Sequence, residues 1–110
     1  MRNWLIQIKK GYLDLCILSL IHRCEQVYGL GIIEKLTLHG IQLKEGTLYP
    51  LLSRMTKDGT LTSFWQTEKD SSHPRKYYRL TEKGVASLKE MEREYFDMFD
   101  VFNEIRKGQK

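Results

Sequence analysis

The stretch EGTLYPLLSRMTKDG at residues 45–59 decides the fold of this 110-residue chain. Four of its apolar residues recur at i, i+3, i+4 and i+7, which predicts a helix with one buried stripe. These residues are Leu48, Leu51, Leu52 and Met55. The other face carries hydroxyls and cations, namely Thr47, Tyr49, Ser53, Arg54 and Lys57. We expect Pro50 in the early turns, where a missing N–H matters least, and Gly59 at the end of the helix.

Two helices are expected upstream of this stretch. Residues 11–21, GYLDLCILSLI, are apolar nearly all round the helical wheel, which predicts a helix covered by protein on most sides. A short leading helix, with Trp4, Leu5 and Ile8 at helical spacing, runs into it. Residues 28–38 fit a second helix, which His39 and Gly40 end.

A hairpin and a long helix are expected downstream. Residues 61–68 and 76–80 are rich in aromatic residues and threonine, and the polar KDSSHPR between them forms a turn. The final helix begins near Thr81, a capping residue, and runs to about Lys107. Its apolar residues alternate three and four apart, as in a heptad seam. The seam consists of Leu88, Met91, Tyr95, Met98, Phe102 and Ile105.

This order of elements predicts a mainly α fold with a small β-hairpin: a winged helix-turn-helix followed by a long C-terminal helix. We assign residues 1–80 to a DNA-binding domain and residues 81–110 to a dimerisation helix, within one structural unit. So small a domain cannot bury the whole seam, so a second copy is expected to cover it. The alternative is a helix that folds back on its own core.

Charge narrows the range of partners. The net charge is +4, and residues 44–80 hold seven Lys or Arg against four acids, whereas residues 81–110 hold six against seven. A basic surface attracts nucleic acid, anionic membrane or acidic protein alike. No apolar run approaches the roughly 20 residues of a membrane span, and we expect a cytoplasmic protein.

The cysteines and histidines indicate no chemistry. Cys16 and Cys24 are about 12 Å apart along one predicted helix, too far for a disulfide, so we expect reduced core residues. A redox-sensing Cys24 is the alternative. His22, His39 and His73 show no metal-ligand spacing, and no catalytic constellation is readable. We therefore expect no metal, no cofactor and no enzymatic activity.

A helix that is packed by one stripe and free on the other side suits the major groove of B-DNA. Hydroxyls and cations contact phosphates, and Arg54 is the candidate for a bidentate contact to guanine. The hairpin adds Lys69, Arg75 and Lys76, near a neighbouring phosphate or minor groove. The alternatives are a solvated helix face, or a surface that binds another protein instead of DNA.

The stretch at residues 45–59, followed by a strand pair and by PRKYYRLTEKG, closely resembles the PadR family of bacterial transcriptional regulators. Upstream, LDLCILSLI and YGLGIIEKL resemble that family's first two helices, and the resemblance spans about residues 11–95. It implies a winged-helix dimer, usually a repressor, whose third helix and wing bind the operator. The single helix after the wing is similar to the compact subgroup. A symmetric dimer requires a near-palindromic operator.

The resemblance assigns the recognition-helix positions to Thr47, Tyr49, Arg54 and Lys57, and the wing positions to Arg75 and Lys76. Tyr77 and Tyr78 match the second wing strand, where at least one ring is expected to pack on the core. Lys44 stands where the family commonly has Ser or Thr, which loses a capping oxygen worth about 1 kcal/mol and gains a cation near the DNA. The DSSHP tip also departs from the family's Gly- or Pro-rich tip.

Some regulators of this family sense small hydrophobic or aromatic molecules, often at the dimer interface. The candidates for such an effector pocket are Trp4, Tyr95, Phe96 and Phe99, whose rings offer stacking and apolar burial. The alternative is that these aromatic residues only pack in the core or the interface.

Overall fold

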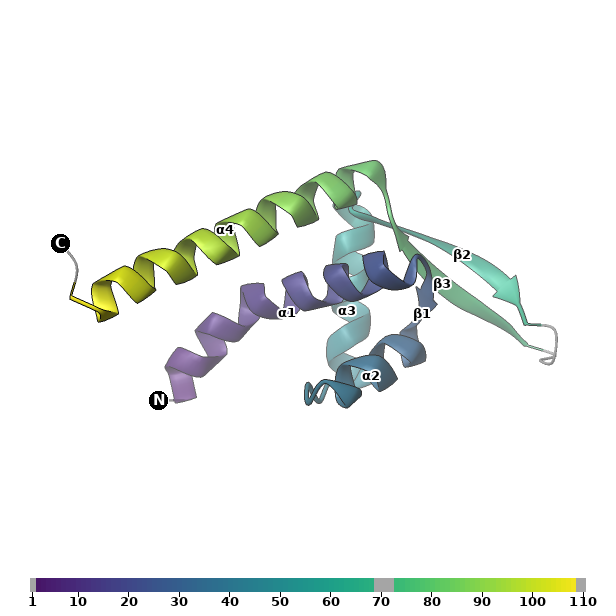
Figure 1. Ribbon diagram of the computed structural model, residues 1–110. Coiled ribbons are helices and arrows are strands. Elements are labelled where there is room, and N and C mark those ends of the chain that lie inside the picture. The colour runs from purple at the N-terminus through teal and green to yellow at the C-terminus, as the bar shows by residue number, and fades with distance from the viewer. Residues whose placement is uncertain (1, 69–72, 109–110) are drawn as a thin grey trace.

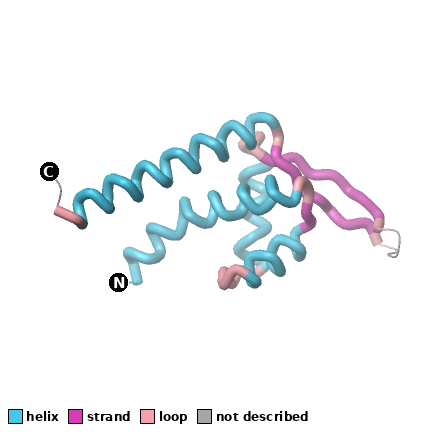
Figure 2. Tube along the Cα trace, viewed as in Figure 1, coloured by secondary structure: helices cyan, strands magenta, loops and turns pink. Residues whose placement is uncertain are grey.

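The computed structural model describes residues 2–68 and 73–108, which form four helices and a three-stranded sheet (Figures 1 and 2). The elements are α1 (Arg2–Cys24), β1 (Val27–Tyr28), α2 (Gly29–Leu38), α3 (Glu45–Lys57), β2 (Leu61–Thr67), β3 (Pro74–Leu80) and α4 (Glu82–Arg106). The molecule is elongated, 61 × 31 × 23 Å, because α1 and α4 extend away from the rest toward the two termini (Figure 1). The predicted mainly α fold is confirmed.

The first helix is longer than expected. The predicted leading helix and the helix over residues 11–21 form one continuous α1, which ends at Cys24. Its second half is buried through Ile17, Leu18 and Ile21, whereas residues 2–12 are exposed. Glu25 then adopts a φ of 68°, a left-handed conformation that ends the helix and turns the chain.

α2 and α3 form the helix-turn-helix. Gly40, expected to end α2, has a φ of 82°, and the Ile41 amide donates to the Leu36 carbonyl at 2.9 Å. This bond satisfies a carbonyl that the helix end would otherwise leave free. The chain then enters α3, which buries its predicted stripe against the core.

The wing contains a third strand that the sequence did not predict. β2 pairs with β3 in antiparallel register from Leu61↔Leu80 to Thr67↔Pro74. β1 pairs with the other edge of β3 and places Val27 opposite Tyr78. Two residues carry too short a pattern to be recognised as a strand without the neighbour that they pair with.

One apolar core joins the helix-turn-helix to the sheet and to the start of α4. Its fully enclosed side chains are Ile17, Ile21, Ile32, Leu48, Leu52 and Leu61. Tyr78 belongs to this core, and Tyr77 is buried as well, which confirms that at least one of the two rings packs inward. Cys16 and Cys24 are free thiols, partly buried beside the core.

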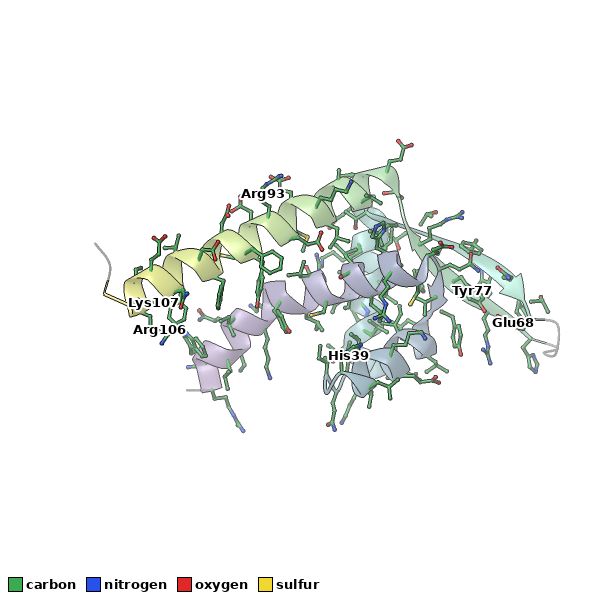
Figure 3. The ribbon with its side chains drawn as sticks, viewed as in Figure 1. His39, Glu68, Tyr77, Arg93, Arg106 and Lys107 are labelled. Atoms are coloured by element: carbon green, nitrogen blue, oxygen red, sulfur yellow. The ribbon has the colours of Figure 1, made fainter. Side chains whose placement is uncertain are left out.

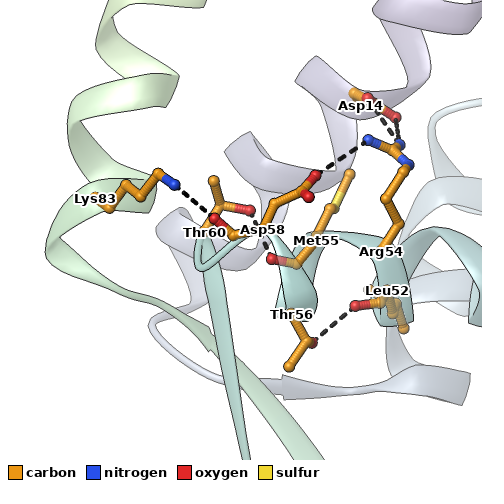
Figure 4. Close-up of polar contacts among 8 residues, drawn as sticks. All are labelled: Asp14, Leu52, Arg54, Met55, Thr56, Asp58, Thr60 and Lys83. Carbon is orange, nitrogen blue, oxygen red and sulfur yellow. Dashed lines mark hydrogen bonds and ion pairs between the residues drawn. The ribbon is translucent and has the colours of Figure 1, made fainter.

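A junction of residues 58–60 and 81–84 ties α4 to the end of α3 and to the base of the wing. Thr81 caps α4: its Oγ1 accepts from the Gly84 amide at 3.0 Å and donates to the Gly59 carbonyl at 2.6 Å. Lys83 Nζ donates to the Asp58 carbonyl at 2.6 Å (Figure 4). Gly84 is buried, and a Cβ there would overlap the backbone carbonyl of Thr60.

Candidate nucleic-acid interface

α3 presents the polar face that its sequence predicts. Thr47, Ser53 and Lys57 are exposed, on the side opposite the buried leucines. Pro50 lies in the second turn, where its missing N–H leaves the Gly46 carbonyl without a helix partner. Both residues are exposed, so water can satisfy that carbonyl. The helix therefore continues unbroken, and its outer face remains open to a partner.

The N-terminus of α3 has no side-chain cap. Lys44 occupies the N-cap position without a side-chain hydrogen bond, as expected from the missing hydroxyl, and its side chain is exposed. Glu45 stands in the first turn, where a carboxylate interacts favourably with the helix dipole.

Tyr49 is held more tightly than its neighbours on the polar face. Its ring packs over Gly29 at the start of α2, since a Cβ at Gly29 would lie 2.7 Å from Tyr49 Cε1. Burial, and next the charge of Glu45, raise the pKa of Tyr49 above its usual value. The side chain is still 38% exposed. Tyr49 thus links α3 to α2 and leaves part of its surface to a partner.

Arg54 extends toward α1 and not away from the protein. Its Nη2 lies 2.9 Å from both carboxylate oxygens of Asp14, and its Nη1 lies 3.9 Å from Asp58 Oδ2 (Figure 4). Asp14 is the only charged residue within residues 11–21. That isolation in an apolar helix was the signal that could have revealed a partner. A contact between Arg54 and guanine stays a prediction, and it requires this ion pair to open.

The two described wing cations of the predicted site lie on opposite faces of the hairpin, because successive strand residues alternate. Lys76 shares a face with Tyr78, and its Nζ lies 5.9 Å from the centre of that ring. Arg75 lies on the other face, with Cζ 4.4 Å from the ring centre of Tyr28 in β1. Lys69 lies outside the described residues.

The outer face of the sheet is occupied by packed rings. Tyr77 stacks on Phe64 with ring centres 5.9 Å apart and meets Tyr28 edge-on at 5.6 Å. The Tyr77 hydroxyl donates to the Glu68 carboxylate at the outer end of β2 (Figure 3). This packing fixes the ring of Tyr28, and with it the position of Arg75.

The other face of the wing continues the surface of α3. Burial, and next the neighbouring Tyr49 hydroxyl, raise the pKa of Tyr78. α3 packs against β2, and Lys76 lies on the hairpin face that carries the buried ring of Tyr78. We give the name α3–wing surface to the exposed side chains Thr47, Tyr49, Ser53 and Lys57 of α3 together with Lys76 of β3.

α4 divides into a core half and an exposed half. Leu88 is 2% exposed and belongs to the core, and Met91 packs partly against it. This corrects the predicted seam, because a side chain enclosed by its own domain is not available to a second copy. The exposed members of the seam are Tyr95, Met98, Phe102 and Ile105.

A groove of about 1110 Å³ lies between α1 and α4. The rings of Tyr12 and Tyr95 lie beside it with centres 6.2 Å apart. Of the predicted effector residues, Tyr95 and Phe99 line this groove. Trp4 and Phe96 are exposed and do not line it.

Two further properties concern the described part of the chain. Across residues 2–68 and 73–108, no group of three His, Cys, Asp or Glu side chains could hold a metal ion. Within the same residues, no helix has both the length and the apolar content that crossing a membrane requires.

A helix-turn-helix with a free polar face and a β-wing beside it defines a winged helix-turn-helix protein. Residues 17–90 match the family described as Transcriptional regulator PadR-like family. The chain belongs to this family, as its motifs indicate, and is a transcriptional regulator and not an enzyme.

Similar proteins support this assignment. Transcriptional regulator Rv3488 of Mycobacterium tuberculosis is 35% identical over 75 residues, which are 66% of this chain and 68% of that protein. The X-ray structure of a PadR-like transcription factor from Bacteroides fragilis is 40% identical with a TM-score of 0.79, covering 94% of this chain and 98% of that one. A PadR-like transcriptional regulator from Bacillus cereus is 35% identical with a TM-score of 0.83, covering 94% and 99%.

Proposed function

We propose that this chain is a cytoplasmic, sequence-specific DNA-binding repressor that acts as a homodimer. The observation that carries the proposal is the α3–wing surface: a free helix face with hydroxyls and a cation lies beside the face of the wing that carries Lys76. A helix of this kind fits the major groove, while a wing beside it reaches the adjacent backbone or minor groove.

In this proposal, most contacts go to phosphates. Lys44, Thr47, Ser53 and Lys57 supply them from α3, with Tyr49 at the edge of the helix and Lys76 on the wing. Arg75 adds a contact from the outer face of the hairpin, and Lys69, which lies outside the described residues, remains a predicted contact. Arg54 reads guanine after it leaves Asp14.

The dimer forms through the exposed apolar residues at the far end of the molecule. α4 contributes Tyr95, Met98, Phe102 and Ile105, and α1 contributes Trp4, Leu5, Ile6 and Ile8. An exposed apolar surface on two neighbouring helices favours association with a second copy. Residues 1–80 then bind DNA and residues 81–110 dimerise, although the first turns of α4 are packed into the core. Two-fold symmetry makes the operator nearly palindromic.

A small hydrophobic or aromatic effector relieves repression in this proposal. The groove between α1 and α4 supports it, since Tyr95 and Phe99 line the cavity next to further apolar side chains. The test is a saturable change in DNA binding on addition of a lipophilic aromatic dye such as 8-anilinonaphthalene-1-sulfonate. Dye binding without any change in DNA binding would separate the groove from regulation.

DNA binding itself is tested by titrating a fluorescent duplex, taken from immediately upstream of the gene, at several salt concentrations. Log affinity should fall with log salt by about 0.9 per phosphate contact. Lys57→Ala should weaken binding to all sequences alike, and Arg54→Ala should relax sequence preference. Lys89→Ala, an exposed cation on α4, is the matched control. No binding at low salt would favour the alternative, a winged-helix module that binds another protein.

A further inference from the structure

Trp65 in β2 is an exposed indole on the wing. Its side chain is 68% exposed, although the residues on either side of it in the hairpin are engaged. Phe64 stacks on Tyr77 on the outer face. Within residues 2–68 and 73–108, the side chain of Trp65 has no ring contact, hydrogen bond or ion pair. Single exposed apolar residues are common at protein surfaces, so a partner at Trp65 is indicated by the side chains around the indole and not by its exposure alone.

The register of the hairpin places Trp65 on the α3–wing surface. Trp65 pairs directly with Lys76, so the two side chains leave the sheet on the same face, about 5 Å apart at their Cβ atoms. Ser63 pairs with Tyr78 on that same face, next toward the core. The indole of Trp65 and the side chain of Lys76 thus project from the same face of the hairpin, and the Lys76 ammonium lies over the ring of Tyr78.

The charge of the hairpin selects the partner. Residues 61–80 hold four Lys or Arg and two acids, and one of the acids, Glu68, accepts a hydrogen bond from Tyr77. The partner is therefore anionic, but it must also offer an apolar surface to the indole ring. A DNA backbone alternates phosphates with deoxyribose rings, which fits a cation beside an aromatic ring.

We infer that Trp65 is a DNA-contacting residue of the wing, an inference that rests on the proposed DNA binding. Its ring packs against a deoxyribose at the edge of the minor groove, next to the major-groove segment that α3 enters. Lys76 binds the adjacent phosphate. Trp65 supplies contact area without charge, and Lys76 supplies charge.

Intrinsic fluorescence tests this contact, because Trp4 and Trp65 are the only tryptophans of the chain. Trp4→Phe leaves Trp65 as the single indole and keeps an aromatic ring in the proposed dimer interface, which light scattering checks; Trp65→Phe leaves Trp4 for comparison. On saturation with the upstream duplex, the emission of Trp65 should change and its quenching by acrylamide should fall. The emission of Trp4 should not change. Bound duplex with an unaltered Trp65 signal overturns the inference and leaves the proposed function standing.

Affinity and salt dependence separate Trp65 from Lys76. Trp65→Ala and Trp65→Thr should each weaken duplex binding about tenfold, the low end for an aromatic contact to nucleic acid. The salt slope should stay unchanged, whereas Lys76→Ala should lower it by about one. Trp65→Thr retains strand propensity and guards against loss of the hairpin, which thermal unfolding checks. Parent-like affinity in both variants contradicts the inference, and so does acrylamide shielding that grows with protein concentration in the absence of DNA.

Discussion

Arg54 and Asp14 join α3 to α1 through an ion pair, with Arg54 Nη2 at 2.9 Å from both Asp14 carboxylate oxygens. Both residues also border the groove between α1 and α4. Their side chains are 48% and 24% exposed, so the pair contributes less than about 1 kcal/mol to stability. The ion pair matters for binding because it holds the Arg54 guanidinium against α1, away from a DNA base.

Asp14→Asn should strengthen binding to the upstream duplex a few-fold, because Arg54 no longer gives up an ion pair when it reaches the DNA. Arg54→Ala should weaken binding and reduce discrimination against unrelated sequence. Anisotropy titrations at one salt concentration measure both effects. If Asp14→Asn binds as the parent does and Arg54→Ala loses no discrimination, Arg54 only positions α3.

Leu88 and Phe102 should respond in opposite ways to truncation. Leu88→Ala leaves a cavity in the core and should lower the free energy of unfolding by about 2–5 kcal/mol. Phe102→Ala removes an exposed ring, 58% accessible in the single chain, and should mainly weaken the dimer. Urea unfolding and light scattering over a dilution series distinguish the two. A dimer as tight in Phe102→Ala as in the parent would place the interface elsewhere.

Alanine substitutions at two helical glycines test how tightly the start of α4 packs at the junction of residues 58–60 and 81–84. Gly84→Ala should destabilise the fold by about 1–3 kcal/mol, because its Cβ would meet the Thr60 backbone carbonyl, which cannot move aside easily. Gly11→Ala, in α1, has nothing within 4 Å and should stabilise by about 0.5–1 kcal/mol. Thermal unfolding of both variants measures the difference. Equal effects would mean that α4 is not seated on Thr60.

The free energy of unfolding should fall above pH 10, which is the ordinary pKa of a tyrosine side chain. Burial, then Tyr49, raise the pKa of Tyr78 in the folded state. Above that ordinary value the unfolded chain loses the phenol proton first, so the free energy of unfolding is constant below it and decreases as the pH rises toward the folded pKa. Tyr78→Phe should reduce this decrease without abolishing it, because a hydrogen bond with Cys16 also raises the pKa of Tyr12. Urea titrations at several alkaline pH values should show the smaller slope, and identical slopes would contradict the assignment.

Periodicity predicted the long elements well because each buries one stripe. The spacing of Leu48, Leu52 and Met55 located α3 almost to the residue, and the capping hydroxyl of Thr81 located the start of α4. The confirmed order of elements and the match to the family follow from these local patterns.

Contacts between distant segments were beyond such patterns. No local pattern pairs Arg54 with Asp14, 40 residues earlier, or places a two-residue strand along β3. Leu88 fits a heptad seam by spacing alone, and only the packed structure shows that the core encloses it. Trp65 was assigned to a strand correctly, but its exposure depends on how far the hairpin extends beyond the core.

The hydrogen bonds around Gly59 and Thr81 hold the start of α4 rigidly against the rest of the domain. The C-terminal half of α4 extends away from the core, while its first turn is bonded to Asp58 and Gly59, between α3 and the wing. In the proposed dimer, a rotation of that end of α4 would be passed through these hydrogen bonds to α3 and the wing. The distance between the α3 helices of the two proposed subunits would then change without any refolding.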